Sequence, residues 1–186
     1  MVIGICGSGI GAGKSTLARQ LAQRFDLCIH PFAAKLKEAV VALDPMLEGG
    51  KRLSELGNIK CFEEHKRDSP ELRRILQRMG TEVGRNVFDE DFWVQLWAHF
   101  LPTTQGVVAD DVRFENEANF IRKLGGILVF VQGKVLPTSA LNSHASEQQA
   151  DKLRELCHLE IFNQGTLLEY HAEIIRAGNF IEEVIQ

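Results

Sequence analysis

The stretch GSGIGAGKST, from Gly7 to Thr16, contains four glycines and ends with a lysine followed by two hydroxyl residues. Glycine loses more backbone freedom on folding than any other residue, so this density indicates a tight turn or a close approach to another group. In the pattern G-x-x-x-x-G-K-S/T, backbone N–H groups wrap phosphate oxygens, the lysine reaches the β- and γ-phosphates and the hydroxyl ligates Mg²⁺. The stretch therefore predicts a phosphate-binding loop.

The residues on either side of the stretch fit this interpretation. The run VIGIC (2–6) is typical of a buried strand, and Leu17, Leu21 and Phe25 recur at helical spacing after the loop. A helix that starts at the loop would direct its positive N-terminal end at a bound anion. We predict that seven residues contact the phosphates: Gly9, Gly11, Ala12, Gly13, Lys14, Ser15 and Thr16.

The spacing of the loop departs from the pattern by one position. Counting back from Lys14, the first glycine of the pattern should stand at residue 8, where this chain has Ser8. Two interpretations are open. Either Ser8 takes the turn position, or the loop is one residue longer and begins at Gly7.

A second set of reactive side chains lies in the stretch GVVADDVRFENEA (106–118). Ligands of open α/β sheets bind at the carboxyl ends of the strands, which is where Asp110 and Asp111 would stand. An acidic residue there can hold Mg²⁺ through water or accept a hydrogen bond from a substrate, and Arg113 can reach an acceptor phosphate. The alternative for the two acids is a strand-ending turn with a helix cap.

Arginines between the second and third predicted strands could serve phosphoryl transfer. That reaction requires the protein mainly to position two anions and to neutralise the charge on the migrating group. Arginine suits the task because its planar guanidinium binds phosphate through two parallel hydrogen bonds. The candidates are Arg73, Arg74, Arg78 and Arg85. Surface helices also carry arginines as solvated charge, so this alternative stays open for each of them.

Apolar runs separated by helical stretches predict the scaffold that positions these residues. Runs without an alternating polar face predict buried parallel strands at 2–6, 27–30, 106–110, 126–131 and 159–162. Helices are predicted at 33–43, 69–80, 90–101, 115–126 and 164–178. Ser69 and Thr166 are the expected N-caps, and Gly80 and Gly178 the expected stops. The alternation is typical of the α/β class. The charged stretch 45–68 lacks periodicity and is either an insertion over the site or a solvated loop.

Composition limits the partners. The chain has 186 residues, 45% of them hydrophobic, which suits one domain over 1–186. A formal charge of −4 gives no general attraction to nucleic acid or to an anionic membrane surface. No run approaches the roughly 18 apolar residues of a membrane span, and the N-terminus lacks the features of a signal peptide, so we expect a cytoplasmic protein. The four cysteines and six histidines show no ligand spacing, which argues against a structural metal.

A phosphate-binding loop alone serves kinases, GTPases and motor ATPases, so the rest of the chain must decide between them. No N-K-x-D string for guanine recognition occurs, and helicases and transporter ATPases are normally larger. The wide gap at 31–105 between the second and third strands would house the acceptor pocket of a small-molecule kinase.

Two blocks, LRRILQRMGTEVGRNVFDEDFWVQLW (72–97) and VVADDVRFENEANFIRKLGG (107–126), resemble those of the phage-type deoxynucleoside monophosphate kinases. The likeness runs over nearly the whole chain and includes HASE (144–147) and IFNQGTLLEY (161–170). It implies the three-layer P-loop NTPase fold of nucleoside monophosphate kinases, with a five-stranded parallel sheet. In that fold, 31–105 would be the helical region that binds the acceptor nucleotide, and 132–152 a lid-like segment.

The resemblance also implies a reaction, in which the γ-phosphoryl group of ATP passes to the 5′-phosphate of a deoxynucleoside monophosphate (dNMP) with Mg²⁺ present. The residues that it implies as catalytic are Lys14, Arg74, Asp111 and Arg113. Those implied at the metal are Ser15 and Asp110. Those implied at the acceptor are Lys37, Arg73, Arg74, Gln77, Arg85, Trp93, Asp111, Arg113 and Glu117. Trp93 would line the base and sugar pocket, although DFWVQLW (91–97) could equally be a helix that packs its apolar face into a core.

One departure from the family concerns the lid. Similar proteins tend to carry an arginine at the end of the fourth strand, where this chain has Gln132. Lys134 can supply a charge there but not a planar fork. His144 and Glu147 either act in the lid or cap a helix that starts near Ser146.

Two other functions fit the loop: a P-loop kinase for another acceptor, such as dephospho-coenzyme A, and a nucleotide-binding regulator that transfers no phosphate. Base preference and subunit number stay open, a homodimer included. The resemblance points to a bacterial virus or prophage as the source.

Overall fold

The computed structural model describes residues 1–9, 11–56, 69–134 and 150–186. The predictions for His144 and Glu147, and for most of the lid-like segment, lie outside the described residues. The described chain forms two compact units, one of residues 1–31 and 101–186 and the other of residues 32–100. The assignment of 31–105 to acceptor binding is not tested by this division and stays a prediction.

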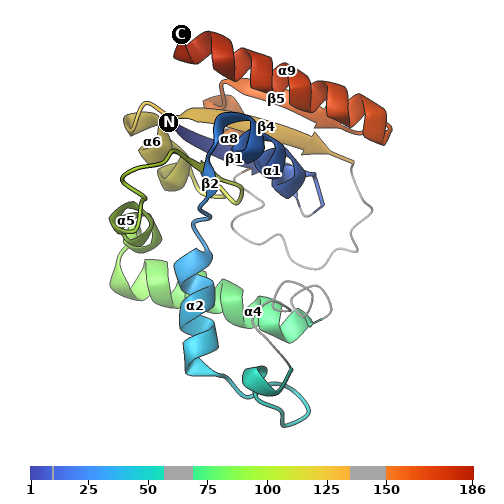
Figure 1. Cartoon of the computed structure of the whole chain (residues 1–186). Coiled ribbons are helices and arrows are strands. Elements are labelled where there is room, and N and C mark those ends of the chain that lie inside the picture. The colour runs from blue at the N-terminus through green and yellow to red at the C-terminus, as the bar shows by residue number, and fades with distance from the viewer. Residues whose placement is uncertain (10, 57–68, 135–149) are drawn as a thin grey trace. The chain divides into compact units, whose positions relative to one another are not determined.

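A parallel sheet of five strands organises the first unit (Figure 1). The strands are β1 (Val2–Gly7), β2 (Cys28–Ile29), β3 (Val107–Ala109), β4 (Ile127–Gly133) and β5 (Leu159–Asn163). Their order across the sheet is β2-β3-β1-β4-β5, so β1 lies between two strands that come much later in the chain. The register sets Ile3 beside Val108 of β3 and Ile127 of β4. The five predicted strands are confirmed, because continuous apolar runs suit strands that are buried on both faces.

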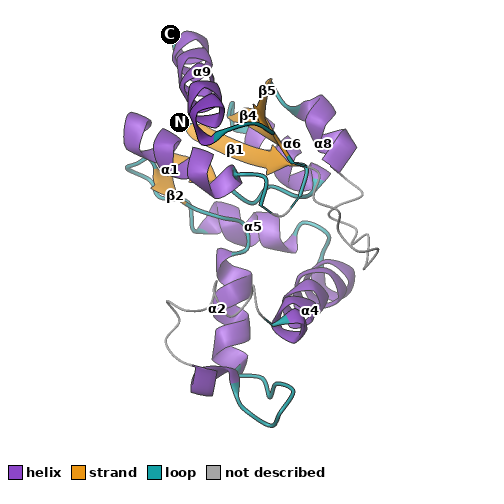
Figure 2. Cartoon of the chain, turned by 90° about the vertical axis from the view of Figure 1, so that its right-hand side faces the viewer, coloured by secondary structure: helices purple, strands orange, loops and turns teal. Residues whose placement is uncertain are grey.

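Helices cover both faces of this sheet (Figure 2). On one face, α1 (Lys14–Phe25) and α9 (Leu167–Ile185) bury a common core in which Leu17 and Ile174 meet side chains of the central strands. On the other face lie α6 (Glu115–Lys123) and α8 (Ala150–Leu156). The three-layer α/β fold is therefore confirmed. None of the helices within the described ranges is long and apolar enough to cross a membrane.

The second unit is helical. It contains α2 (Ala34–Leu43), the short 3₁₀ helix η1 (Leu53–Leu56), α4 (Pro70–Arg78), the π-helical segment η3 (Met79–Phe88) and α5 (Phe92–His99). Val40, Leu72 and Leu76 form a core between α2 and α4. Leu47 and Leu53 of the charged stretch 45–68 also belong to that core, while most of the other described residues of this stretch are exposed. The Trp97 ring stacks on Phe32 with centroids 4.4 Å apart.

The N-caps were predicted correctly. Ser69 Oγ accepts from the N–H of Leu72 at 3.1 Å, which satisfies a backbone donor at the start of α4. Thr166 Oγ1 accepts from the N–H of Glu169 at 3.3 Å, and the Glu169 carboxylate accepts in return from the N–H of Thr166.

Both predicted glycine stops are wrong. The chain does not leave the helical path at Gly80 but continues through η3 to Phe88, and α9 runs past Gly178 to Ile185. Gly178 is buried, and a Cβ there would overlap the guanidinium of Arg24. Close packing between α1 and α9 thus explains this glycine, because a glycine inside a helix can serve the approach of a neighbouring group.

Candidate active site

The phosphate-binding loop joins β1 to α1. Gly11 and Gly13 have φ angles of 79° and 105°, a region that side-chain-bearing residues rarely adopt. Ser8 is not among the residues with positive φ, so this position does not require glycine. Its N–H donates to the carbonyl of Val131 at 3.1 Å, and its Oγ accepts from the N–H of Gly133 at 2.9 Å. Ser8 therefore takes the turn position, where it also ties the loop to the end of β4.

The loop ends in the N-terminus of α1. The carbonyl of Gly13, the N-cap residue, accepts from the N–H groups of Thr16 and Leu17 at 3.0 and 3.1 Å. No acidic residue lies in the first turn of α1, so the positive end of the helix is not neutralised from within the helix. This arrangement suits a bound anion such as phosphate.

Two residues from the end of the chain hold the backbone of the loop. Asn163 Nδ2 donates to the carbonyl of Ala12 at 3.0 Å, and the hydroxyl of Tyr170 donates to the carbonyl of Gly13 at 2.8 Å. The sequence alone did not single out either residue. The only signal was the block IFNQGTLLEY, which contains both of them but gives neither a role.

Lys14 is partly buried at the start of α1, and its Nζ donates to the carbonyl of Gly9 at 2.7 Å. Burial lowers the pKa of this ammonium group to about 8. The positive charge of Arg113 acts in the same direction, while the carboxylates of Asp110 and Asp111 oppose it in part. Lys14 is therefore a poorly solvated cation, and a bound phosphate would stabilise its charge.

Ser15 and Asp110 meet at the carboxyl edge of the sheet. Ser15 Oγ donates to Asp110 Oδ2 at 2.7 Å. Asp110 directly follows β3, and β3 pairs with β1, so the end of β3 lies beside the loop. A hydroxyl and a carboxylate are oxygen ligands of the kind that Mg²⁺ prefers, and this ion usually completes its shell with waters and substrate phosphates. The pair therefore fits the predicted Mg²⁺ site.

The segment after Asp110 brings Arg113 to the start of α6. The N–H groups of Arg113 and Phe114 donate to Glu117 Oε2 at 2.8 and 3.2 Å. Glu117 is only 4% exposed. Its carboxylate thus caps α6 and fixes the backbone of Arg113, whose own side chain is exposed. A contact between Glu117 and the acceptor stays a prediction.

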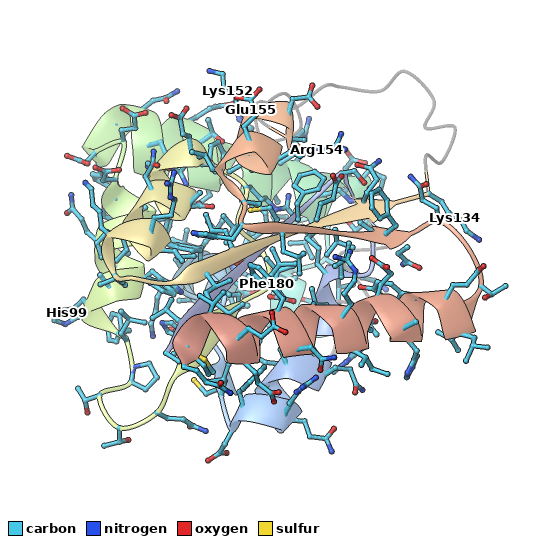
Figure 3. The ribbon with its side chains drawn as sticks, turned by 90° about the horizontal axis from the view of Figure 1, so that it is seen from above. His99, Lys134, Lys152, Arg154, Glu155 and Phe180 are labelled. Atoms are coloured by element: carbon cyan, nitrogen blue, oxygen red, sulfur yellow. The ribbon has the colours of Figure 1, made fainter. Side chains whose placement is uncertain are left out.

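Lys134 follows β4, where the resemblance placed the start of a lid. Figure 3 shows it at the end of β4 beside the start of α9. The hydrogen bonds from Thr166 hold the pKa of the Glu169 carboxyl below its ordinary value, and the charge of Lys134 contributes in the same direction. Gln132 is half-buried in β4. A role of either residue in a lid stays a prediction.

The remaining predicted acceptor residues all belong to the second unit: Lys37, Arg73, Arg74, Gln77, Arg85 and Trp93. Arg74 is exposed on α4 and lines a cavity of about 490 Å³. Arg85 Nη1 donates to the carbonyl of Glu90 at 2.9 Å. The cavity is lined by Leu47, Glu48, Lys51, Leu56, Ser69, Pro70, Glu71 and Arg74.

Trp93 occupies a core position in the second unit. Its side chain is 6% exposed, and its Nε1 donates to the carbonyl of Gly80 at 2.7 Å. A Cβ at Gly84 would overlap the indole, so Gly84 is needed for the close packing of η3 on Trp93. These contacts favour the packing alternative over a base pocket.

Comparisons with known proteins indicate a family. A family model described as deoxynucleotide monophosphate kinase matches residues 40–174. A protein of Acanthamoeba polyphaga mimivirus, provisionally named as such a kinase, is 29% identical over 94% of both chains. The deoxynucleotide monophosphate kinase of Escherichia phage RB69 is 29% identical over 69% of this chain and 54% of its own length.

A solved structure supports the fold alone. TT1252 from Thermus thermophilus superposes with a TM-score of 0.51 at 17% identity, and 97% of each chain is covered.

Proposed function

Because the chain belongs to the deoxynucleotide monophosphate kinase family, we propose that it transfers the γ-phosphoryl group of ATP to the 5′-phosphate of a dNMP. An oxygen of the acceptor phosphate attacks the γ-phosphorus, and the bond between that phosphorus and the β,γ-bridging oxygen breaks. The products are ADP and the deoxynucleoside diphosphate. Such a reaction asks the protein chiefly for positioning and for neutralisation of charge.

The observation that carries this proposal is the meeting of Ser15 and Asp110 beside the phosphate-binding loop, at 2.7 Å. A loop of this kind without a carboxylate next to its hydroxyl residue would bind an anion, but it would lack the pair of oxygen ligands that phosphoryl transfer uses. Ser15 and Asp110 would hold Mg²⁺, and that ion would neutralise charge on the β- and γ-phosphates.

The loop residues would bind the donor. The N–H groups of the loop and of the first turn of α1 would surround the β-phosphate, while the ammonium group of Lys14 would leave the carbonyl of Gly9 and turn to the γ-phosphate. The half-buried position of Lys14 supports this role, because few solvent molecules compete there with a phosphate oxygen.

The acceptor would be bound mainly by cationic side chains. Arg113 and Asp111 stand close enough to Lys14 to influence its pKa, which supports their role at the site of transfer. The other candidates for contacts with the dNMP are the predicted acceptor residues Arg73, Arg74, Gln77, Arg85 and Lys37. Glu117 and Trp93 would then act indirectly, Glu117 by fixing Arg113 and Trp93 by supporting η3.

An ADP-release assay with a panel of dNMPs and ribonucleoside monophosphates tests the proposal. We expect ADP release that depends on at least one dNMP and on Mg²⁺, with the corresponding diphosphate formed in equal amount. ATP binding without turnover on any nucleotide would contradict the proposal and favour a regulator. Turnover with dephospho-coenzyme A alone would favour the other kinase.

A further inference from the structure

The carbonyl groups of the last two residues before Lys14 face the C-terminal part of the same unit. Asn163, at the end of β5, donates to Ala12, and Tyr170, in α9, donates to Gly13. These contacts join parts of the chain that are 151 and 157 residues apart. Neither contact is used by the proposed phosphoryl transfer, so each needs an explanation of its own.

Peptide geometry links these carbonyls to the phosphate site. The carbonyl of one residue and the N–H of the next share a rigid plane and, in a trans peptide, point in opposite directions. No cis peptide occurs in the described chain. The bond to the Ala12 carbonyl therefore helps to set the direction of the Gly13 N–H. The bond from Tyr170 to the Gly13 carbonyl, which also accepts from the N–H groups of Thr16 and Leu17, helps to set that of the Lys14 N–H. These are two of the donors with which a loop of this kind wraps phosphate.

Asn163 and Tyr170 pack tightly against the loop at Gly13. A Cβ at position 13 would lie 2.7 Å from both Asn163 Nδ2 and Tyr170 Oη, in addition to the strain of a positive φ. Tyr170 is 3% exposed. Its burial raises the pKa of the phenol to about 12, so the hydroxyl keeps its proton and stays a donor.

We propose that Asn163 and Tyr170 are positioning residues for the donor nucleotide, holding the Gly13 and Lys14 N–H groups in the direction that binds its phosphates. The inference rests on the proposed function for the identity of the donor, and it concerns residues that never touch the reacting atoms. Preorganised donors avoid the cost of ordering the loop when the ligand binds.

Two variants test the proposal, each removing one donor with little change in volume: Tyr170→Phe and Asn163→Leu. Thr166→Ala is the matched control, because it removes the N-cap of α9 and so weakens the same helix without touching the loop. The measurements are the affinities for ATP and for inorganic tripolyphosphate by calorimetry, the KM values for ATP and dNMP, and the melting temperature.

We expect each test variant to bind ATP and tripolyphosphate about three- to tenfold more weakly, by the same factor for both, which corresponds to the loss of one hydrogen bond. The KM for dNMP should not change. Thr166→Ala should lower the melting temperature and leave both affinities as they are.

Three results would overturn the proposal. Unchanged tripolyphosphate affinity in both test variants would show that the loop keeps its geometry without these bonds. A loss confined to ATP would assign the residues to the nucleoside instead. An equal loss of affinity in Thr166→Ala would show that the effect comes only from the lower stability of α9. A wild-type protein that binds tripolyphosphate but phosphorylates no dNMP would contradict the proposed function alone.

Discussion

The hydroxyl of Ser15 and the carboxylate of Asp110 form a hydrogen bond of 2.7 Å, although 95 residues separate them in the chain. The contact follows from the strand order, because β3 returns to pair with β1 after the whole second unit has been inserted. Carboxyl ends of neighbouring parallel strands meet at one edge of a sheet, and this is where ligands of such folds bind.

Replacing Asp110 should expose its role in metal binding. In Asp110→Asn the side chain keeps its shape but loses its charge, so we expect kcat to fall about 100-fold and the Mg²⁺ concentration for half-maximal activity to rise. Titration of activity with MgCl₂ measures both. Glu155→Gln, at an exposed acid on α8, is the control and should behave as wild type. An unchanged Mg²⁺ dependence in Asp110→Asn would remove this residue from the metal site.

Lys14→Met should separate activity from stability. The ammonium group would no longer stabilise charge on the transferred phosphoryl group, so we expect kcat/KM for ATP to fall about 100- to 1,000-fold. Burial disfavours the charged form of Lys14 in the folded protein, so the same variant should melt at an equal or higher temperature. Lys123→Met, at an exposed position at the end of α6, is the matched control for the loss of a lysine. Near-normal turnover in Lys14→Met would exclude this lysine from the mechanism.

The lowered pKa of Lys14 predicts proton uptake on nucleotide binding. The pKa is about 8 in the folded protein and 10.5 for an ordinary lysine, and a bound triphosphate should restore it to the higher value. Near pH 8 the free site is half protonated, so binding of metal-free ATP should take up about half a proton. Calorimetry in two buffers of different ionisation enthalpy measures this uptake. The uptake should be absent in Lys14→Met, and the affinity of the wild type should fall as the pH rises above 8.

The lowered pKa of Lys14 also determines how this residue's contribution to the free energy of unfolding changes with pH. Below about pH 8 the group is protonated in both folded and unfolded chains, and the folded state carries the full penalty of burying a charge. Between about 8 and 10.5 the unfolded chain binds more protons, so the contribution of Lys14 to stability increases with pH across this window. In a comparison of wild type with Lys14→Met, the difference in unfolding free energy should shrink over that range.

Arg74 should affect the acceptor and not the donor. Loss of a charge-assisted pair of hydrogen bonds in Arg74→Ala should raise the KM for dNMP about 10- to 100-fold and leave the affinity for ATP unchanged. Arg78→Ala is the control, since Arg78 lies on the same helix, is exposed and pairs with Glu82. Equal KM values in the two variants would show that Arg74 is only a surface charge.

Gly84→Ala tests the packing of the second unit. The added methyl group would overlap the Trp93 indole, and we expect a loss of about 1–3 kcal/mol in the free energy of unfolding. Val87→Ala, at an exposed position of the same segment, should cost much less. Denaturant titration provides both values. A neutral Gly84→Ala would mean that Trp93 is not held as the structure shows and would reopen its assignment to a base pocket.

The sequence predicted those features of the fold that depend on local patterns. Five apolar runs became five strands, and Ser69 and Thr166 cap helices as their residue types suggest. Asp110 could be placed at the site because it directly follows a strand. Once the parallel strands are predicted, the residues at their carboxyl ends can be read from the sequence.

The features that were missed depend on contacts between distant segments. Gly178 has the residue type of a helix stop, but α9 continues past it and Arg24 packs against it, while the capping of α6 by the Glu117 carboxylate was not predicted. Asn163 and Tyr170 contact a loop that lies far from them in the sequence. Neither periodicity nor motif spacing predicts such a contact. The sequence shows which groups exist, and the tertiary structure decides what they touch.

The anchoring of the loop by the C-terminal segment also bears on biosynthesis. The residues whose carbonyls accept these bonds, Ala12 and Gly13, are synthesised 151 and 157 residues before Asn163 and Tyr170, so the nascent chain carries the bend long before its two donors have emerged. The loop therefore gains these two hydrogen bonds only after Tyr170 has been made, and a chain that is truncated before Asn163 has a bend without them.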